Sequence, residues 1–185
     1  MRVLLVLAGL LWSGAGVLAD EVNLSLNADS VRAEYARPFA SRPLQWDLGW
    51  MHHTDNGDAL HASLNVTGKL KEGGAPITGG VGLRLAYTNG DASNQTGYGL
   101  AVGGFAHYVF PRYDRLSLRG HAYYAPGVLS GNDMEEYQDY ALQLAYNVLR
   151  EADAYVGLRY VSADYEEASS ANYSTWLHVG MAFRF

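Results

Sequence analysis

The chain ends in the nine residues LHVGMAFRF, which run from Leu177 to Phe185. Every second residue is apolar, and the residues between them are small, polar or basic. This alternation has the period of a β-strand with one apolar face and one face that tolerates polar groups. The stretch therefore predicts a terminal amphipathic strand. We favour a strand of a transmembrane β-barrel, and the alternative is the last strand of a soluble periplasmic β-protein.

The apolar positions of this last strand have a second implication. A strand that closes on an aromatic residue is similar to the signal by which the outer-membrane assembly machinery recognises its substrates. We therefore expect that machinery as a partner of the chain. We assign the signal to the apolar face of the strand, formed by Leu177, Val179, Met181, Phe183 and Phe185.

The N-terminus has the pattern of a secretory signal peptide. Met1-Arg2 is a short basic start, an apolar run follows, and Val17-Leu18-Ala19 fits a cleavage site. The run is shorter than the roughly 20 apolar residues that a spanning helix needs. We expect residues 1–19 to be the signal peptide, 20–43 an N-terminal hairpin or wall segment, and 44–185 a transmembrane barrel. The expected location is the outer membrane of a Gram-negative bacterium.

The composition excludes some classes of protein and favours others. The chain has 0 cysteines, so no disulfide framework supports the exported protein. Its 21 glycines and 14 tyrosines suit a narrow barrel, in which small residues fit the interior and aromatic residues lie at the membrane interfaces. The net charge of −6 argues against a nucleic-acid partner.

Eight segments with alternating apolar and polar residues follow from Leu44 onward. Their apolar phase consists of Leu, Val, Ala, Tyr and Trp without a charge, whereas the other phase combines Gly and Ala with Arg and His. A charge that faces lipid at the bilayer midplane costs about 2–4 kcal/mol, so this segregation predicts a lipid face and a lumen face. The segments are Leu44–His53, Asp58–Thr67, Gly80–Thr88, Gly97–Val109, Asp114–Ala125, Tyr137–Leu149, Ala152–Ser162 and Tyr173–Phe185.

The segment from Glu21 to Arg37 decides the number of strands. Its alternation changes phase near Asn27–Ser30, which predicts a tight turn between two short strands. We expect an all-β, antiparallel up-and-down barrel of eight strands, or of ten if this hairpin spans the membrane. The wall must close in either case, because an open edge in lipid would leave backbone groups unpaired.

Charged and imidazole side chains of the inner phase are candidates for a functional lumen. Arginines outnumber the expected inward acids, which are Asp47, Glu34 and, toward the outer rim, Asp139. The lumen is therefore either a salt-bridged plug, which we favour, or a narrow passage that prefers anions. We expect Asp47 to pair with at least one arginine, and Arg32 to join the set if its strand is part of the wall. The charged candidates are Asp47, Arg84, Arg115, Arg119, Arg159 and Arg184, and the histidines are His61, His107, His121 and His178.

The sequence indicates no metal site and no cofactor. The inward histidines fall on different strands, so we interpret them as hydrogen-bonded lumen residues. Acidic residues gather in the predicted external loops. We expect these charges to keep the loops solvated, and the alternative is that they hold divalent cations. No pair of histidines has the spacing of a zinc-binding helix.

A set of short motifs is spread over the chain after the N-terminal run. The motifs are Asn27–Arg32, Gly82-Leu83-Arg84, Tyr123-Tyr124-Ala125-Pro126, Val128-Leu129-Ser130, Tyr137, Tyr146 and Tyr155–Arg159. Together they resemble the YfaZ family of small outer-membrane proteins. This resemblance implies an outer-membrane barrel whose biochemical role is largely undefined.

An enzymatic role is a further alternative. Barrel lipid A 3-O-deacylases carry a His and a Ser two residues apart on a late strand, and the comparable place here is Tyr160-Val161-Ser162. A serine without a neighbouring base is not activated, so we expect no catalytic residues. We expect a structural or surface-exposed barrel, or alternatively a narrow channel for small anions. The expected surroundings are outer-membrane lipid and lipopolysaccharide, with the protein as a monomer.

Overall fold

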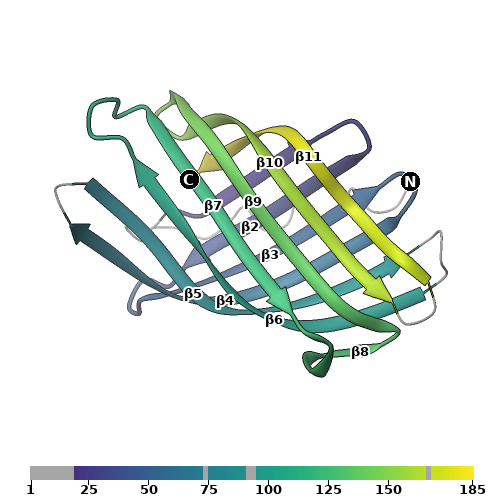
Figure 1. Cartoon of the computed structure of the whole chain (residues 1–185). Coiled ribbons are helices and arrows are strands. Elements are labelled where there is room, and N and C mark those ends of the chain that lie inside the picture. The colour runs from purple at the N-terminus through teal and green to yellow at the C-terminus, as the bar shows by residue number, and fades with distance from the viewer. Residues whose placement is uncertain (1–18, 73–74, 91–94, 166–167) are drawn as a thin grey trace.

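Ten strands form the closed wall of a barrel, in which the first strand pairs with the last (Figure 1). The computed structural model describes residues 19–72, 75–90, 95–165 and 168–185. All neighbouring strands of the wall are antiparallel. They are β1 (Glu21–Leu26), β2 (Ser30–Pro38), β3 (Leu44–His53), β4 (Gly57–Glu72), β5 (Ala75–Gly90), β6 (Gln95–Val109), β7 (Leu116–Ala125), β9 (Met134–Leu149), β10 (Ala152–Tyr165) and β11 (Ala168–Arg184).

The two ends of the barrel differ. At the terminal end, Asp20 and Phe185 exchange backbone hydrogen bonds of 2.9 and 3.0 Å. At the loop end, a short 3₁₀-helix, η2 (Gly127–Leu129), leads into the three-residue strand β8 (Ser130–Asn132), which pairs with β6. Within the described residues, no helix is long and apolar enough to cross a membrane.

The N-terminal segment is part of the wall, so our preference for eight strands was wrong and the ten-strand alternative is confirmed. The predicted turn is present, because the side chain of Asn27 accepts a 2.6 Å hydrogen bond from the backbone N–H of Ser30. The strand β1 has six residues, fewer than the roughly 9–11 that a membrane-spanning β-strand requires. Its pairing with β11 continues through Asp20 and Phe185, and this extension completes the wall.

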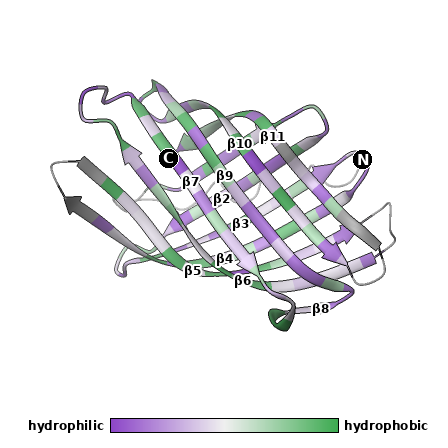
Figure 2. Ribbon diagram, viewed as in Figure 1, coloured by the Kyte–Doolittle hydropathy of each residue, from purple (hydrophilic) through white to green (hydrophobic). Residues whose placement is uncertain are grey.

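Outward and inward side chains separate along the strands as the alternation predicts. On β5, Val81 and Leu83 are 70% and 49% exposed, whereas Arg84 is 3% exposed. Figure 2 shows hydrophobic and hydrophilic residues alternating along the strands. Because this apolar surface surrounds the barrel, it provides the face that lipid requires.

The strands β4 and β5 extend beyond the predicted segments Asp58–Thr67 and Gly80–Thr88, so that only residues 73–74 separate them. The signal-peptide prediction falls on residues 1–18, which lie outside the described residues except for Ala19. Residues 91–94 and 166–167 of two predicted external loops also lie outside them.

The last strand departs from regular alternation near Trp176. Tyr173 and Ser174 are both buried, whereas Trp176 and Leu177 are both exposed. Trp176 has φ of 77°, a backbone conformation that costs a bulky residue about 1–3 kcal/mol. This irregularity places the indole on the lipid face, where aromatic side chains occupy the membrane interface.

Candidate functional site

Ion pairs that centre on Asp139 of β9 cross the middle of the barrel. The carboxylate is fully buried and accepts two hydrogen bonds from Arg32, at 3.1 and 3.0 Å. It also contacts the guanidinium of Arg84, and His121 lies 2.9 Å away. The sequence predicts Asp139 near the outer rim, but the structure places it at the hub of this buried network.

The carboxylate of Asp47 on β3 is a second acceptor in this network and shares Arg84 with Asp139. It accepts hydrogen bonds from Ser63 at 2.7 Å and Asn65 at 3.2 Å, and Arg84 lies 3.4 Å away. The expected pairing of Asp47 with an arginine is therefore confirmed. Arg84 also lies over the ring of Tyr123, with 3.8 Å between the guanidinium carbon and the ring centroid. Arg84 thus joins two carboxylates and an aromatic face.

A separate group of charges ties four strands together at the terminal end. Arg119 of β7 donates to Glu21 of β1 at 3.1 Å and also contacts Asp153 of β10. Arg184 of β11 donates to the same Asp153 at 3.0 Å. Because Glu21 and Arg184 belong to the first and last strands, this cluster supports the seam where the barrel closes.

Arg159 of β10 is buried by a different arrangement. Its three nitrogens donate to the hydroxyls of Ser174, Ser25 and Ser30, at 2.9, 2.7 and 3.2 Å. No carboxylate of the described residues lies within ion-pair distance. Its charge is therefore solvated by hydroxyl dipoles of β1, β2 and β11.

The expected excess of positive charge is not found in the described lumen. Five arginines face the interior, and five carboxylates lie among them or nearby. One candidate, Arg115, is misplaced in the prediction: it lies exposed in the turn before Leu116, where β7 begins, so it extends beyond the wall. The balanced set consists of Arg32, Arg84, Arg119, Arg159 and Arg184 with Glu21, Glu34, Asp47, Asp139 and Asp153.

Apolar and phenolic side chains fill the lumen on the loop side of the ion pairs. Met51 of β3 and Tyr137 of β9, from opposite sides of the wall, belong to one buried cluster. The hydroxyl of Tyr165 donates to Thr88 at 2.8 Å and lies 3.0 Å from the hydroxyl of Tyr173. These large buried side chains leave the interior packed at the loop end.

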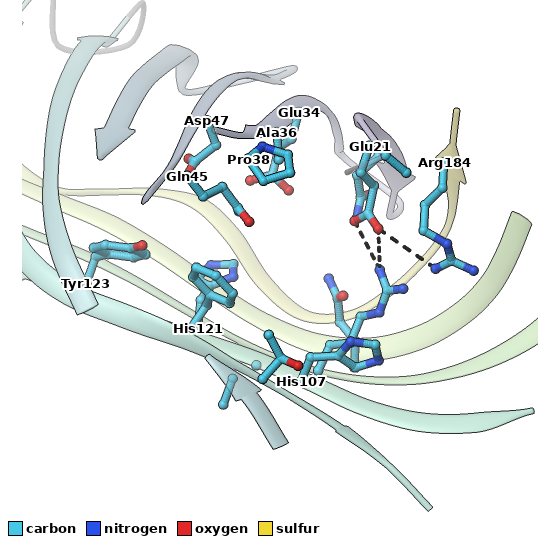
Figure 3. A pocket seen from close by; sticks show the side chains of 18 of the residues that line it. Glu21, Glu34, Ala36, Pro38, Gln45, Asp47, His107, His121, Tyr123 and Arg184 are labelled. Carbon is cyan, nitrogen blue, oxygen red and sulfur yellow. Dashed lines mark hydrogen bonds and ion pairs between the residues drawn. The ribbon is translucent and has the colours of Figure 1, made fainter. Parts of the chain in front are cut away.

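A cavity of about 270 Å³ remains on the terminal side of the ion pairs (Figure 3). Glu34 and Asp47 line it from β2 and β3, and His107 and His121 line it from β6 and β7. Figure 3 shows Glu21 and Arg184 at one side of the cavity, with Glu21 contacting both guanidinium groups of the terminal cluster. Charged and apolar side chains therefore both line the cavity.

The four candidate histidines lie inside the barrel but do not form one site. His61 lies 3.4 Å from both Glu34 and Asp47, and His121 contacts Asp139. His178 is buried beside Gln143, at 3.2 Å, and His107 lines the cavity. Within the described residues, no group of three or more metal-ligating side chains could hold a metal ion.

The surroundings of Ser162 contain no catalytic arrangement within the described part of the chain. Its hydroxyl is buried and has no hydrogen-bond partner there. Tyr160 points to the outside and stacks on Tyr140, with 6.5 Å between ring centroids. An apolar groove on the outer wall is lined by these two rings and Trp176.

The five residues assigned to the assembly signal form one exposed face. Leu177, Val179, Met181, Phe183 and Phe185 are 62%, 47%, 40%, 38% and 52% exposed. They lie on β11 and its last residue, next to β1. Their function as a signal stays a prediction.

Together, the closed barrel, its apolar outer surface and its charged, packed interior define an outer-membrane β-barrel protein. The chain belongs to the YfaZ family, since the family model described as YfaZ precursor matches residues 2–185. The family indicated by the sequence motifs is thereby confirmed.

Two solved structures match this chain with TM-scores below 0.5. A chain described in work on the in-meso crystallization of membrane proteins has 11% identity and a TM-score of 0.45, and the match covers 91% of this chain and 83% of that chain. NanC porin, solved in a rhombohedral crystal form, has 9% identity and a TM-score of 0.43, with coverage of 91% and 100%. The comparison with curated proteins gave no match.

Two lumen carboxylates were missed by the sequence analysis. Asp153 precedes the outward residue Ala154, so its inward direction follows from the alternation that assigned Arg159. Glu21 belongs to the hairpin whose place in the wall was left open. Counting both acids would have removed the expected arginine excess.

Proposed function

We propose that this protein is a closed outer-membrane barrel that does not conduct solutes, with a structural or surface-exposed role. The proposal is supported by the order in which layers of side chains follow one another along the inside of the barrel. Ion pairs around Asp139 cross the middle, and a packed cluster that includes Met51 and Tyr137 follows toward the loop end. Such an interior holds the strands together but offers no continuous polar path.

The alternative of a narrow anion channel has less support. It depended on an excess of arginines in the lumen, and the five arginines there are equalled in number by five carboxylates among the described residues, while serine hydroxyls hold Arg159. Ser162 gives little support to an enzymatic role, because Asp164 lies nearby on the same strand but no histidine contacts the hydroxyl among the described residues.

The proposal includes the route to the membrane. The apolar face of β11 supports recognition by the outer-membrane assembly machinery, and cleavage near Ala19 would leave Asp20 to pair with Phe185. The wall closes on itself within one chain, which supports a monomer surrounded by lipid and lipopolysaccharide.

Osmotic swelling of proteoliposomes tests the proposal. Liposomes that contain the folded protein are diluted into isotonic solutions of arabinose, glucose or sodium gluconate, and light scattering reports the influx. We expect no swelling above that of empty liposomes. Swelling with gluconate in excess of the neutral sugars would instead establish the anion channel, and swelling with all three a general pore.

A further inference from the structure

The exposed lysine and arginine side chains that the structure describes all lie at the terminal end of the barrel. They are found near the ends of β2 and β4 and in the connectors that follow β2, β6 and β9. We call this group the terminal rim. It consists of Arg37, Arg42, Lys69, Arg112, Arg115 and Arg150.

The loop end carries the opposite charge. The stretches between the wall strands there contain six Asp and Glu residues and no Lys or Arg. These stretches are residues 27–29, 54–56, 91–94, 126–133 and 166–167. At the terminal end, the described acids outside the lumen are Asp20, Asp114 and Glu151, so the cations of the rim outnumber them. An anionic partner is therefore attracted to the terminal end and repelled from the loop end.

Most basic groups of the rim are free to contact a ligand. Arg37 lies 3.6 Å from Asp20, whose carboxylate also accepts a 2.6 Å hydrogen bond from Tyr35. The other five have no carboxylate within ion-pair distance among the described residues. The backbone holds two of them in place, because the carbonyl groups of Arg42 and Arg115 accept hydrogen bonds of 2.8 and 2.7 Å. Exposed donors of this kind suit phosphate oxygens.

Aromatic side chains mark the depth of the rim in the membrane. Arg37 lies directly opposite Trp46 in the β2–β3 register, and the indole meets the ring of Tyr35 edge-on, with 5.3 Å between centroids. On β6 and the connector that follows it, Tyr108 and Phe110 form a similar pair at 5.1 Å. Aromatic girdles of membrane barrels lie at the interfaces, so the rim lies at the level of the lipid headgroups. Long basic side chains extend into that layer.

We propose that the terminal rim binds the phosphate groups of anionic phospholipids in the leaflet at that end of the barrel. Its depth beside the aromatic pairs favours a lipid over a soluble anion, and its unpaired cations favour an anionic headgroup over a zwitterionic one. This interaction goes beyond the proposed closed barrel and depends on no feature of the lumen.

Tryptophan quenching by brominated lipids tests the proposal, because the chain supplies two separate reporters. Trp46 lies beside the rim, whereas Trp176 faces outward on β11 opposite Arg159, away from the rim. In the mature chain without residues 1–19, Trp50→Phe with Trp176→Phe leaves only Trp46, and Trp46→Phe with Trp50→Phe leaves only Trp176. Each folded protein is placed in phosphatidylcholine vesicles that contain brominated phosphatidylglycerol or brominated phosphatidylcholine.

We expect brominated phosphatidylglycerol to associate at Trp46 at least about threefold more strongly than brominated phosphatidylcholine. At Trp176 we expect the two lipids to quench about equally, because no cation of the rim lies beside it. The bromine is placed near the top of the acyl chains, close to the depth of the interface.

Arg42→Gln with Lys69→Gln in the protein that keeps Trp46 assigns the charges. The two residues belong to neighbouring segments, since the N–H of Thr67 donates a 2.8 Å hydrogen bond to the carbonyl of Pro43. We expect the preference for phosphatidylglycerol to fall close to one. Arg42→Lys with Lys69→Arg is the matched control, which keeps both charges and is expected to keep the preference. Heat-dependent migration in gels checks that each variant is folded.

Three results would overturn the proposal. The first is equal quenching of Trp46 by the two brominated lipids. The second is a preference for phosphatidylglycerol at Trp176 as strong as at Trp46, which would separate the attraction from the rim. The third is an unchanged preference in the folded Arg42→Gln, Lys69→Gln protein. None of these measurements reports solute influx, so a failure here can be distinguished from a failure of the closed-barrel proposal.

Discussion

Replacing Asp139 with Asn is expected to lower the free energy of unfolding by about 3 kcal/mol. The substitution keeps the size of the side chain but removes the negative charge that two buried guanidinium groups, Arg32 and Arg84, share. Each arginine keeps a second carboxylate, Glu34 or Asp47, so the loss stays near the lower end for a broken buried pair. Urea unfolding in lipid vesicles, followed by tryptophan fluorescence, measures the change.

The matched control for this substitution is Asp55→Asn. Asp55 is exposed in the turn between β3 and β4, so the same chemical change there alters the free energy of unfolding by less than about 0.5 kcal/mol. Equal stabilities of the Asp139→Asn and Asp55→Asn proteins would contradict the assignment of Asp139 as the hub of the lumen network.

Gly103→Ala is expected to destabilise the barrel by about 1–3 kcal/mol, through crowding and not through lost charge. A Cβ at Gly103 would lie 2.1 Å from the carbonyl oxygen of Ala122 and 2.7 Å from Cα of Tyr123. These are backbone atoms of the neighbouring strand, which no side-chain rotation can move. Gly103 lies opposite Gly82 in the β5–β6 register. The side chains of Tyr123 and Asn65 lie close to these two glycines, and the Tyr123 hydroxyl donates a 2.8 Å hydrogen bond to Asn65.

Gly68→Ala provides the comparison, since a Cβ at Gly68 would meet nothing within 4 Å. Its stability is expected to equal or slightly exceed that of the wild type, because alanine restricts the unfolded chain more than glycine does. The measurement is the temperature at which each folded variant changes its gel migration. We expect a lower temperature for Gly103→Ala than for Gly68→Ala. If both alanines were tolerated equally, the close packing of β6 against β7 would be refuted.

Much of the wall could be predicted from the sequence because lipid imposes a strict rule. The segment Leu44–His53 has the predicted bounds, and others differ mainly by extending farther, as β4 does to Glu72. Alternation also identified Asp47 and Arg84 as inward residues, and the need to neutralise buried charge predicted that Asp47 pairs with an arginine, which is Arg84.

Other features were not predictable from local alternation. The strand β1 is short, and its place in the wall depends on pairing with β11, far away in the sequence. Trp176 falls on the inward-facing positions of the predicted alternation. It faces outward because the backbone of β11 is irregular at this residue. The partners of Asp139 come from β2, β5 and β7, and the sequence alone does not give the relative height of side chains on different strands.

Single-channel recording in planar bilayers tests the closed interior most directly. The folded protein, identified by its heat-dependent gel migration, is inserted into a symmetric bilayer in potassium chloride. The account predicts a silent bilayer, because the ion pairs at Asp139 and the cluster containing Tyr137 close the lumen. Discrete conductance steps that change in an Arg84→Ala or Arg119→Ala variant would contradict it and identify the lining of a channel.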